Sequence, residues 1–146
     1  MPERVEHFTD LRVWRMAHQL FLDLCKDLAG TRASSPESVI AEQILRSCGS
    51  VGANIAEGFN RTQRKFANAL DIALGEASET ENWLYKLRDV GALSEETAAE
   101  RLRTVIDIEK MLRSLRSEIL RNQDALRETD AEYVMPVDGG DPEQPA

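Results

Sequence analysis

Apolar side chains recur at alternating intervals of three and four residues along most of the chain, and no stretch alternates apolar and polar residues as a half-buried strand does. This spacing places the apolar residues on one face of an α-helix. The pattern therefore predicts an all-α protein. The strictest series is typical of helices that pack in bundles, and consists of Val105, Ile108, Leu112, Leu115 and Ile119.

Glycine, proline and capping residues divide this pattern into four segments. Gly30 and Gly91 are natural stops, because glycine adopts the left-handed conformation that follows many helices. Ser34 or Ser35 is expected to cap the second helix, and Ser94 the fourth. The predicted helices cover about residues 9–29, 36–59, 62–90 and 95–126.

The chain has 146 residues, enough for one ordinary domain with a sizeable core. We predict an up-down four-helix bundle over residues 9–128, preceded by an N-terminal arm of residues 1–8. Residues 129–146 are acidic and interrupted by proline and glycine, so we expect a disordered acidic tail. No apolar run of about 18 residues and no signal peptide is visible, which favours a cytoplasmic protein with no membrane partner.

The net charge of −8 is unevenly distributed along the chain. Residues 124–146 contain seven acidic residues against one arginine and account for −6 of it, so the body of the protein is nearly neutral. A neutral body gives no general attraction for nucleic acid, but a local basic patch can still bind phosphates.

Two local clusters of cations supply candidates for such a patch. Arg61, Arg64 and Lys65 fall at the predicted turn between the second and third helices, and Arg12 and Arg15 lie one turn apart near the start of the first. Guanidinium groups suit phosphates because they offer paired donors at a fixed charge. We therefore take these five residues as candidate nucleic-acid-binding residues; the alternative is an ordinary solvated surface.

The second helix contains a stripe of small residues at Gly49, Gly52 and Ala56. An interior glycine costs a helix roughly 1 kcal/mol relative to alanine, so some contact should offset that cost. We expect another helix to approach closely here. A ligand lying near the backbone is the alternative.

A polar set follows on the same helix. Asn54, Glu57 and Arg61 share one face if the helix continues through Gly58, which predicts a structural or interface network, with a polar functional site as the alternative. Trp14 lies on the apolar stripe of the first helix and is expected in the core.

Few residues are available for catalysis or metal binding. The chain has two histidines and no Glu-x-x-His pair of the kind that holds di-iron in helix bundles. Cys25 and Cys48 lie within apolar patterns, and we expect buried reduced thiols rather than a disulfide or a redox pair. No catalytic residue, metal or cofactor is therefore assigned, and the protein is expected not to be an enzyme.

Three segments resemble a known family. Residues 8–17 (FTDLRVWRMA) resemble its opening Phe-x-x-Leu-x-Val-Trp-x-x-Ala, residues 54–61 (NIAEGFNR) resemble its Asn-Ile-Ala-Glu-Gly-x-x-Arg signature, and residues 66–84 resemble its third helix. This is the four-helix bundle family first found encoded in intervening sequences of bacterial 23S rRNA genes, also labelled S23 ribosomal protein. The resemblance covers about residues 8–120.

The resemblance implies a homopentameric ring. It also implies similarity to the accessory variability proteins of diversity-generating retroelements, which bind nucleic acid and a reverse transcriptase. Independently, Leu74, Trp83 and Tyr85 lie partly off the inward stripe of the third helix and leave apolar surface for a subunit interface. We expect a non-catalytic homo-oligomeric scaffold that associates with RNA, DNA or a nucleic-acid enzyme; the alternative is a protein-interaction module without nucleic acid.

Overall fold

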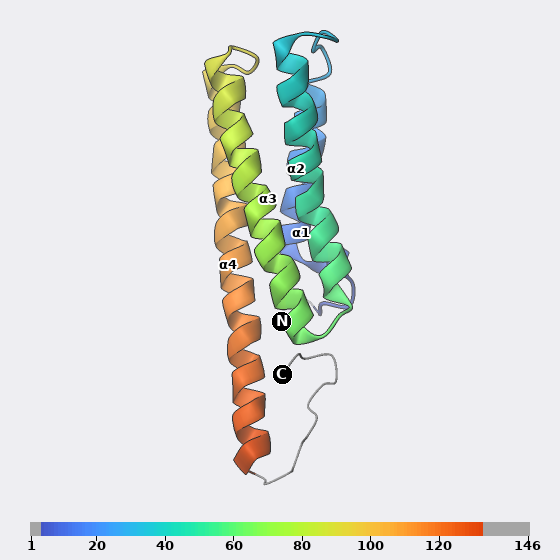
Figure 1. Cartoon of the computed structure of the whole chain (residues 1–146), viewed down its shortest axis with the longest axis vertical. Coiled ribbons are helices and arrows are strands. Elements are labelled where there is room, and N and C mark those ends of the chain that lie inside the picture. Colours follow the sequence, from blue (N-terminus) through green and yellow to red (C-terminus); the bar gives the residue numbers. More distant parts are fainter. Residues whose placement is uncertain (1–3, 133–146) are drawn as a thin grey trace.

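The computed structural model describes the backbone of residues 4–132 and the side chains of residues 4–123. Over this range the chain forms one short 3-10 helix and four α-helices, and no strand, which confirms the all-α prediction (Figure 1). The elements are η1 (Phe8–Asp10), α1 (Arg12–Asp27), α2 (Pro36–Phe59), α3 (Gln63–Asp89) and α4 (Glu95–Glu132).

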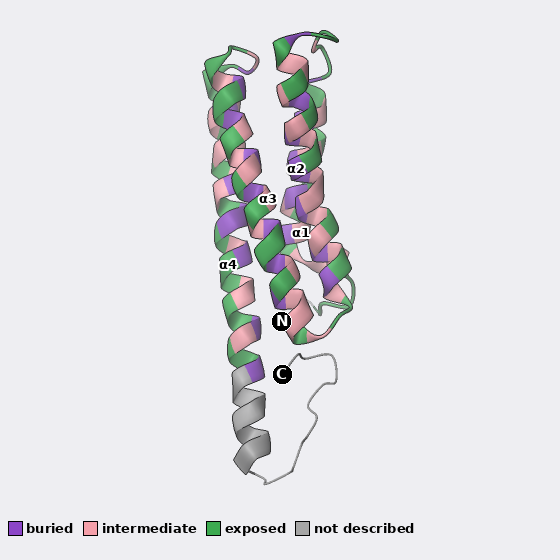
Figure 2. Ribbon diagram, in the orientation of Figure 1, coloured by how far each residue is buried: buried purple, intermediate pink, exposed green. Residues whose placement is uncertain are grey.

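The four α-helices run alternately up and down, and each packs against its neighbours in the chain (Figure 1). The α2–α3 and α3–α4 contacts are the most extensive, whereas the shorter α1 makes fewer contacts with α2 and α4. Burial is confined to the inward face of each helix, with exposed residues on the outward face (Figure 2). The seam between α1 and α4 is therefore the weakest side of the bundle.

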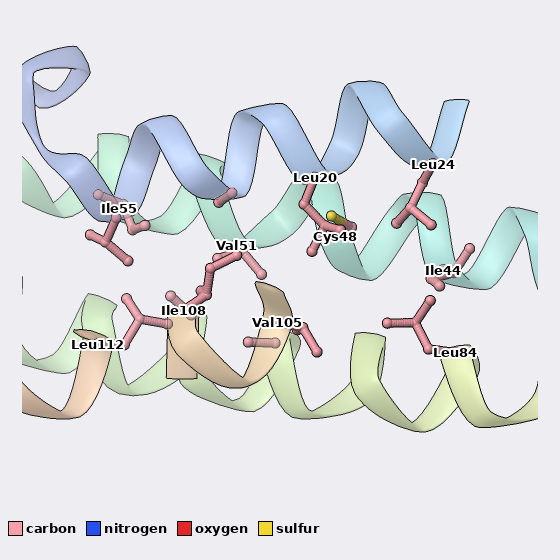
Figure 3. Packing of buried hydrophobic residues seen from close by; sticks show 14 of the residues in the cluster. Leu20, Leu24, Ile44, Cys48, Val51, Ile55, Leu84, Val105, Ile108 and Leu112 are labelled. Carbon is pink, nitrogen blue, oxygen red and sulfur yellow. The ribbon is translucent and has the colours of Figure 1, made fainter. Parts of the chain in front are cut away.

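The core is a continuous column of aliphatic side chains between the two helix pairs. Residues of α1 and α2 point toward residues of α3 and α4 across the bundle axis, and most are fully buried (Figure 3). Such a column is the consequence of the 3-4 spacing in the sequence. Its labelled members are Leu20, Leu24, Ile44, Cys48, Val51, Ile55, Leu84, Val105, Ile108 and Leu112.

Side-chain caps begin three of the helices. The hydroxyl of Ser35 accepts a hydrogen bond from the Ser38 N–H at 3.2 Å, and the hydroxyl of Ser94 accepts one from the Thr97 N–H at 3.1 Å. Thr62 caps α3 in the same way. Each cap satisfies one of the amide groups that a helix N-terminus leaves without a partner. Both serine predictions are confirmed.

The prediction for the start of the first helix was wrong. The carboxylate of Asp10 accepts hydrogen bonds from the backbone N–H groups of Glu6 and His7, at 3.0 Å each, and closes a separate 3-10 turn. These two bonds lower the pKa of Asp10. Leu11 then adopts an extended conformation, so α1 begins only at Arg12.

The predicted stop at Gly30 was also wrong. α1 ends at Asp27, and successive tight turns follow, in which Ala29 and Thr31 donate to the carbonyls of Lys26 and Leu28. The left-handed residue of this loop is Ser34, with φ 64°. By contrast Gly91, which follows α3, has φ 79° as expected.

α4 continues to Glu132, past the predicted helix end at Leu126 and past the predicted domain end at residue 128. In Figure 1 it extends beyond the other three helices. Most of the expected acidic tail, residues 133–146, lies outside the described residues. No described helix is long and apolar enough to cross a membrane.

Candidate nucleic-acid interface

The two cation clusters lie at the same end of the bundle. α1 begins beside the turn that joins α2 to α3, and both are at the lower end of the view in Figure 1. The N-terminal ends of α1 and α3 both lie at this end, because the two helices run in the same direction. The side chains of Arg12, Arg15 and Arg61 are exposed, whereas Arg64 and Lys65 are half-buried.

The first turn of α3, like that of α1, carries cations and no acid, whereas the first turns of α2 and α4 carry acids. Arg64 and Lys65 are among the first three residues of α3, whereas Glu37 lies in the first turn of α2 and Glu95 in that of α4. The partial positive charge of a helix N-terminus disfavours cations by a few tenths of a kcal/mol up to about 1 kcal/mol each. The combined positive potential there attracts anions such as phosphate.

Charge is sorted along the bundle axis. The contacts Ser47–Thr80, Asp71–Arg116 and Asp27–Arg101 show which residues of neighbouring helices lie at the same level, and divide the described chain near Arg15, Gly52, Leu74 and Leu112. The half that contains the α2–α3 turn comprises residues 4–15, 53–74 and 113–123. We name it the basic half, and the remainder, residues 16–52 and 75–112, the acidic half.

Counted to residue 123, the basic half has nine Lys and Arg against five Asp and Glu, a net charge of +4; residues 124–132, by which α4 extends past this end, add four acids and one arginine. The acidic half has eight Lys and Arg against thirteen Asp and Glu, a net charge of −5. The near-neutral body inferred from the sequence is thus the sum of two opposite ends. A charge separation of this kind directs polyanions to one end of the molecule.

Cations of α4 join the basic half, and the sequence analysis did not find them. Arg113, Arg116 and Arg121 lie on α4 within it, and Lys110 lies at its border. The signal was present, since residues 110–123 contain these four cations and a single acid, Glu118.

An apolar groove between α1 and α4 adjoins these cations. Its volume is about 360 Å³. We call it the α1–α4 groove; it is lined by Leu11, Arg12, Val13, Lys110, Met111, Ser114, Leu115 and Glu118. Arg12 therefore faces α4 and lies on a different side of the bundle end from the α2–α3 turn. The candidate residues share one end but do not form one contiguous cluster.

The small residues of α2 accommodate the aromatic rings of α1. A Cβ atom added at Gly49 would lie 3.4 Å from the Phe21 ring, and one added at Gly52 would lie 3.3 Å from Trp14 Nε1. An open groove of about 410 Å³ remains between the two helices, with Ala56 in its lining. We call it the α1–α2 groove.

Trp14 was wrongly expected in the core. It is only half-buried, and its indole stacks on His18 with ring centres 4.8 Å apart and meets Phe8 edge to face at 5.4 Å. The core positions of this part of α1 are Val13 and Ala17, and Trp14 lies at the edge of the buried stripe, where its indole packs over α2.

The predicted face of Asn54, Glu57 and Arg61 is not formed by one helix. α2 ends at Phe59, and the Arg61 N–H donates to the carbonyl of Gly58 in the turn, so Arg61 is not part of the helical face. Asn54 instead donates from Nδ2 to the carbonyl of Ser50 at 2.8 Å, and Glu57 is exposed.

Gly58 makes the tightest helix approach at a glycine of the described chain, and the sequence analysis overlooked it. A Cβ atom there would collide with the Cβ of Ala69, and would lie 3.2 Å from Phe66 Cδ1. The absence of a side chain at Gly58 therefore lets α3 turn back closely against α2. This contact fixes where Arg61, Arg64 and Lys65 are presented.

The expectation of buried thiols holds for Cys48, which is a poor nucleophile, but Cys25 is only half-buried. Both are free; Cys48 is buried, and burial raises the pKa of its thiol to about 12. Among the described residues, no group of three or more His, Cys, Asp or Glu side chains is arranged to hold a metal ion.

Comparison with known proteins identifies relatives of most of the bundle. Residues 9–114 match the sequence model of the 23S rRNA-intervening sequence protein family. A solved structure from Bacteroides thetaiotaomicron, of unknown function and assigned to the S23 ribosomal protein family, is 32% identical with a TM-score of 0.63. The match covers 70% of this chain and 96% of that one. No curated protein matches the chain.

Proposed function

Since the chain belongs to the 23S rRNA-intervening sequence protein family, we propose that it is a non-catalytic homo-oligomeric scaffold that binds nucleic acid, alone or with a nucleic-acid enzyme such as a reverse transcriptase, through the basic half of its bundle. The single observation that carries the proposal is the charge separation within residues 4–123, with a net charge of +4 in the basic half and −5 in the acidic half. An isolated helical bundle gains nothing in stability from this sorting, because it gathers like charges. A polyanion bound at one end accounts for it.

The proposed contacts are phosphate contacts rather than base readout. Arg12, Arg15 and Arg61 are exposed, and the first turn of α3 adds Arg64, Lys65 and the helix N-terminus. Such groups recognise the sugar-phosphate backbone and carry little sequence information. We therefore propose binding of low sequence specificity that weakens steeply with salt.

Exposed apolar residues support the oligomeric part of the proposal. Val39, Ile72 and Val90 are each at least half exposed, on α2, on α3 and at the α3 C-terminus. A subunit interface would bury such residues. We therefore propose a homo-oligomer, and we take the pentameric ring from the family resemblance.

One observation favours the alternative of a protein-interaction module. The α1–α2 groove is open, apolar and flanked by the aromatic residues Phe8, Trp14 and Phe21. Grooves with aromatic walls commonly receive a partner helix or peptide. This candidate predicts a protein partner and no binding of nucleic acid.

Fluorescence anisotropy with labelled single- and double-stranded RNA and DNA tests the proposal. The affinity of the Arg61→Ala/Arg64→Ala/Lys65→Ala variant should fall. On duplex DNA, log K falls with log salt, and this slope should become less steep by up to about 0.9 for each phosphate that the variant no longer neutralises. The matched control, Lys26→Ala/Arg32→Ala/Arg103→Ala, removes three exposed cations from the acidic half and should bind like the parent. Equally weakened binding by both variants would reject the interface.

Light scattering coupled to size exclusion tests the assembly. A mass of five subunits is expected, with excess absorbance at 260 nm if nucleic acid is carried through purification. A monomer would contradict the scaffold, whereas an oligomer that binds no nucleic acid at low salt would leave the protein-interaction module.

A further inference from the structure

The α1–α4 groove has an apolar floor with two cations at its edge. Leu11, Val13, Met111 and Leu115 contribute the apolar side chains, and Leu11, Met111 and Leu115 are only half-buried. Arg12 enters from α1 and Lys110 from α4, both exposed. The groove therefore suits an extended segment with apolar residues between carboxylates.

The last residues of the chain have this composition. Residues 138–146 read DGGDPEQPA, with three acids and two prolines, and residues 133–146 contain no lysine or arginine. Asp141 and Glu143 flank Pro142, and Pro145 lies two residues after Glu143. A segment of this kind favours an extended backbone, and its carboxylates are complementary to the groove cations.

The connection is long enough to bring these residues to the groove. α4 ends at Glu132, and the helix rise of about 1.5 Å per residue places Glu118 about 21 Å and Lys110 about 33 Å back from that end. An extended chain covers about 3.3 Å per residue, so it reaches the level of Glu118 at about Gly139 and the level of Lys110 at about Glu143. The uncharged glycines thus pass the one acid of the groove.

We propose that residues 139–143 dock in the α1–α4 groove of the same chain, with Asp141 and Glu143 paired to Arg12 and Lys110 and Pro142 on the apolar floor. The apolar run of residues 133–137 is too close in sequence to Glu132 to reach the groove. The occupant is thus the acidic end of the segment rather than its most hydrophobic part.

Docking places carboxylates on a cation of the basic half. If the chain binds nucleic acid there, which rests on the function proposed above, the segment competes with phosphate for Arg12 and lowers affinity at low salt. The acidic segment then acts as an internal competitor that a nucleic acid with many phosphate contacts displaces.

Disulfide trapping in the full-length chain tests the docking. Ser114, which lines the groove, and Gly140, which the extended chain brings to the level of Ser114, are replaced by cysteine in a Cys25→Ser background, and Cys48 stays buried. Oxidation in a glutathione buffer should give an intrachain disulfide, seen as a faster-migrating monomer on a non-reducing gel and confirmed by peptide mass. The effective concentration of the two introduced thiols for each other, measured from the disulfide formed in the glutathione buffer, should fall at least tenfold in the Arg12→Glu/Lys110→Glu variant.

The matched control is Lys26→Glu/Lys86→Glu, which reverses two exposed cations of the acidic half and should leave the intrachain disulfide unchanged. Circular dichroism establishes that each variant remains folded. Equal trapping in the two reversal variants, or an interchain disulfide in place of the intrachain one, would overturn docking within the chain.

A second measurement separates this inference from the proposed function. The Asp138→Asn/Asp141→Asn/Glu143→Gln variant should bind labelled single-stranded RNA several-fold more tightly than the parent at 50 mM salt and equally at 500 mM. If the intrachain disulfide forms but neither the parent nor this variant binds RNA, docking is confirmed and the nucleic-acid function is rejected. RNA binding without trapping would reject docking alone.

Discussion

Arg101 on α4 holds Asp27 at the end of α1 through two parallel hydrogen bonds, from Nε to Oδ2 at 2.7 Å and from Nη2 to Oδ1 at 3.0 Å. Both side chains are mostly buried, and Asp23 adds a second carboxylate 3.7 Å from Nη1. This pair joins two helices whose mutual contact is otherwise small. It ties down the acidic half of the α1–α4 seam, whereas the groove opens in the basic half.

Arg101→Ala should lower the free energy of unfolding by about 1–3 kcal/mol, because Asp27 loses a bidentate partner while it stays mostly buried. Arg101→Lys should recover only part of that loss, since an ammonium group cannot reproduce the two parallel bonds. Urea denaturation measures both. Arg103→Ala, at an exposed position two residues along α4, is the control and should change stability little; an equal loss there would contradict the role of the pair.

Gly58→Ala should destabilise the protein by about 1–3 kcal/mol, although alanine is the better helix former by about 1 kcal/mol. The added Cβ collides with Ala69 and crowds Phe66, both at the start of α3. Gly75→Ala is the matched control, because nothing lies within 4 Å of a Cβ added at that helical position. It should raise the melting temperature. If the Gly58→Ala and Gly75→Ala variants were equally stable, α3 would move away from the added Cβ with no loss in the free energy of unfolding.

Gly52→Leu should move the Trp14 indole outward, because even a Cβ at Gly52 lies 3.3 Å from Trp14 Nε1. In a Trp83→Phe background Trp14 is the only tryptophan, and its emission should shift to longer wavelength as water reaches the ring. Gly30→Leu, at an exposed loop position with open space, serves as the control. An unchanged spectrum would place the leucine elsewhere than against the indole.

The helices and their caps could be predicted from local sequence because their causes are local. The 3-4 spacing defines the buried face, and Ser35 and Ser94 satisfy amide groups only three residues away. The start of α1 could not, because the Asp10 carboxylate closes a 3-10 turn with residues that precede it, and helical periodicity does not register such a bond.

The candidate site was only partly predictable, because it depends on how the helices are aligned. Arg12 and Arg61 are distant in sequence, and only the antiparallel packing brings them to one end. The same packing brings Arg116 of α4 to that end and places most of the acidic residues at the other end. The net charge of the chain reveals neither arrangement. Gly58 was overlooked for the same reason, since its steric requirement comes from Ala69 on the next helix.

A pair of neighbouring carboxyl groups, of which Glu109 is buried and Glu81 half-buried, gives the protein a pH dependence. Glu109 on α4 is 6% exposed, and burial, together with the neighbouring Glu81 carboxyl, raises its pKa to about 7, which Arg113 3.7 Å away opposes. The Tyr85 hydroxyl donates to Glu81 Oε2 at 3.0 Å and holds that carboxyl on α3. Glu109 is therefore protonated more readily when the protein is folded than when it is unfolded.

Between pH 4.5 and 7 the folded state binds more protons at Glu109 than the unfolded state, so the free energy of unfolding should fall as pH rises through this range and stay low above it. Glu109→Gln cannot ionise and should remove this loss, which makes the variant more stable than the parent at pH 8 by on the order of 2 kcal/mol. Urea denaturation at pH 5.5, 7 and 8.5 measures the difference. Asp107→Asn, exposed on the same helix, should retain the parental pH profile. If Glu109→Gln retained it too, the pH dependence would originate in other groups, because burial would not then oppose ionisation of Glu109.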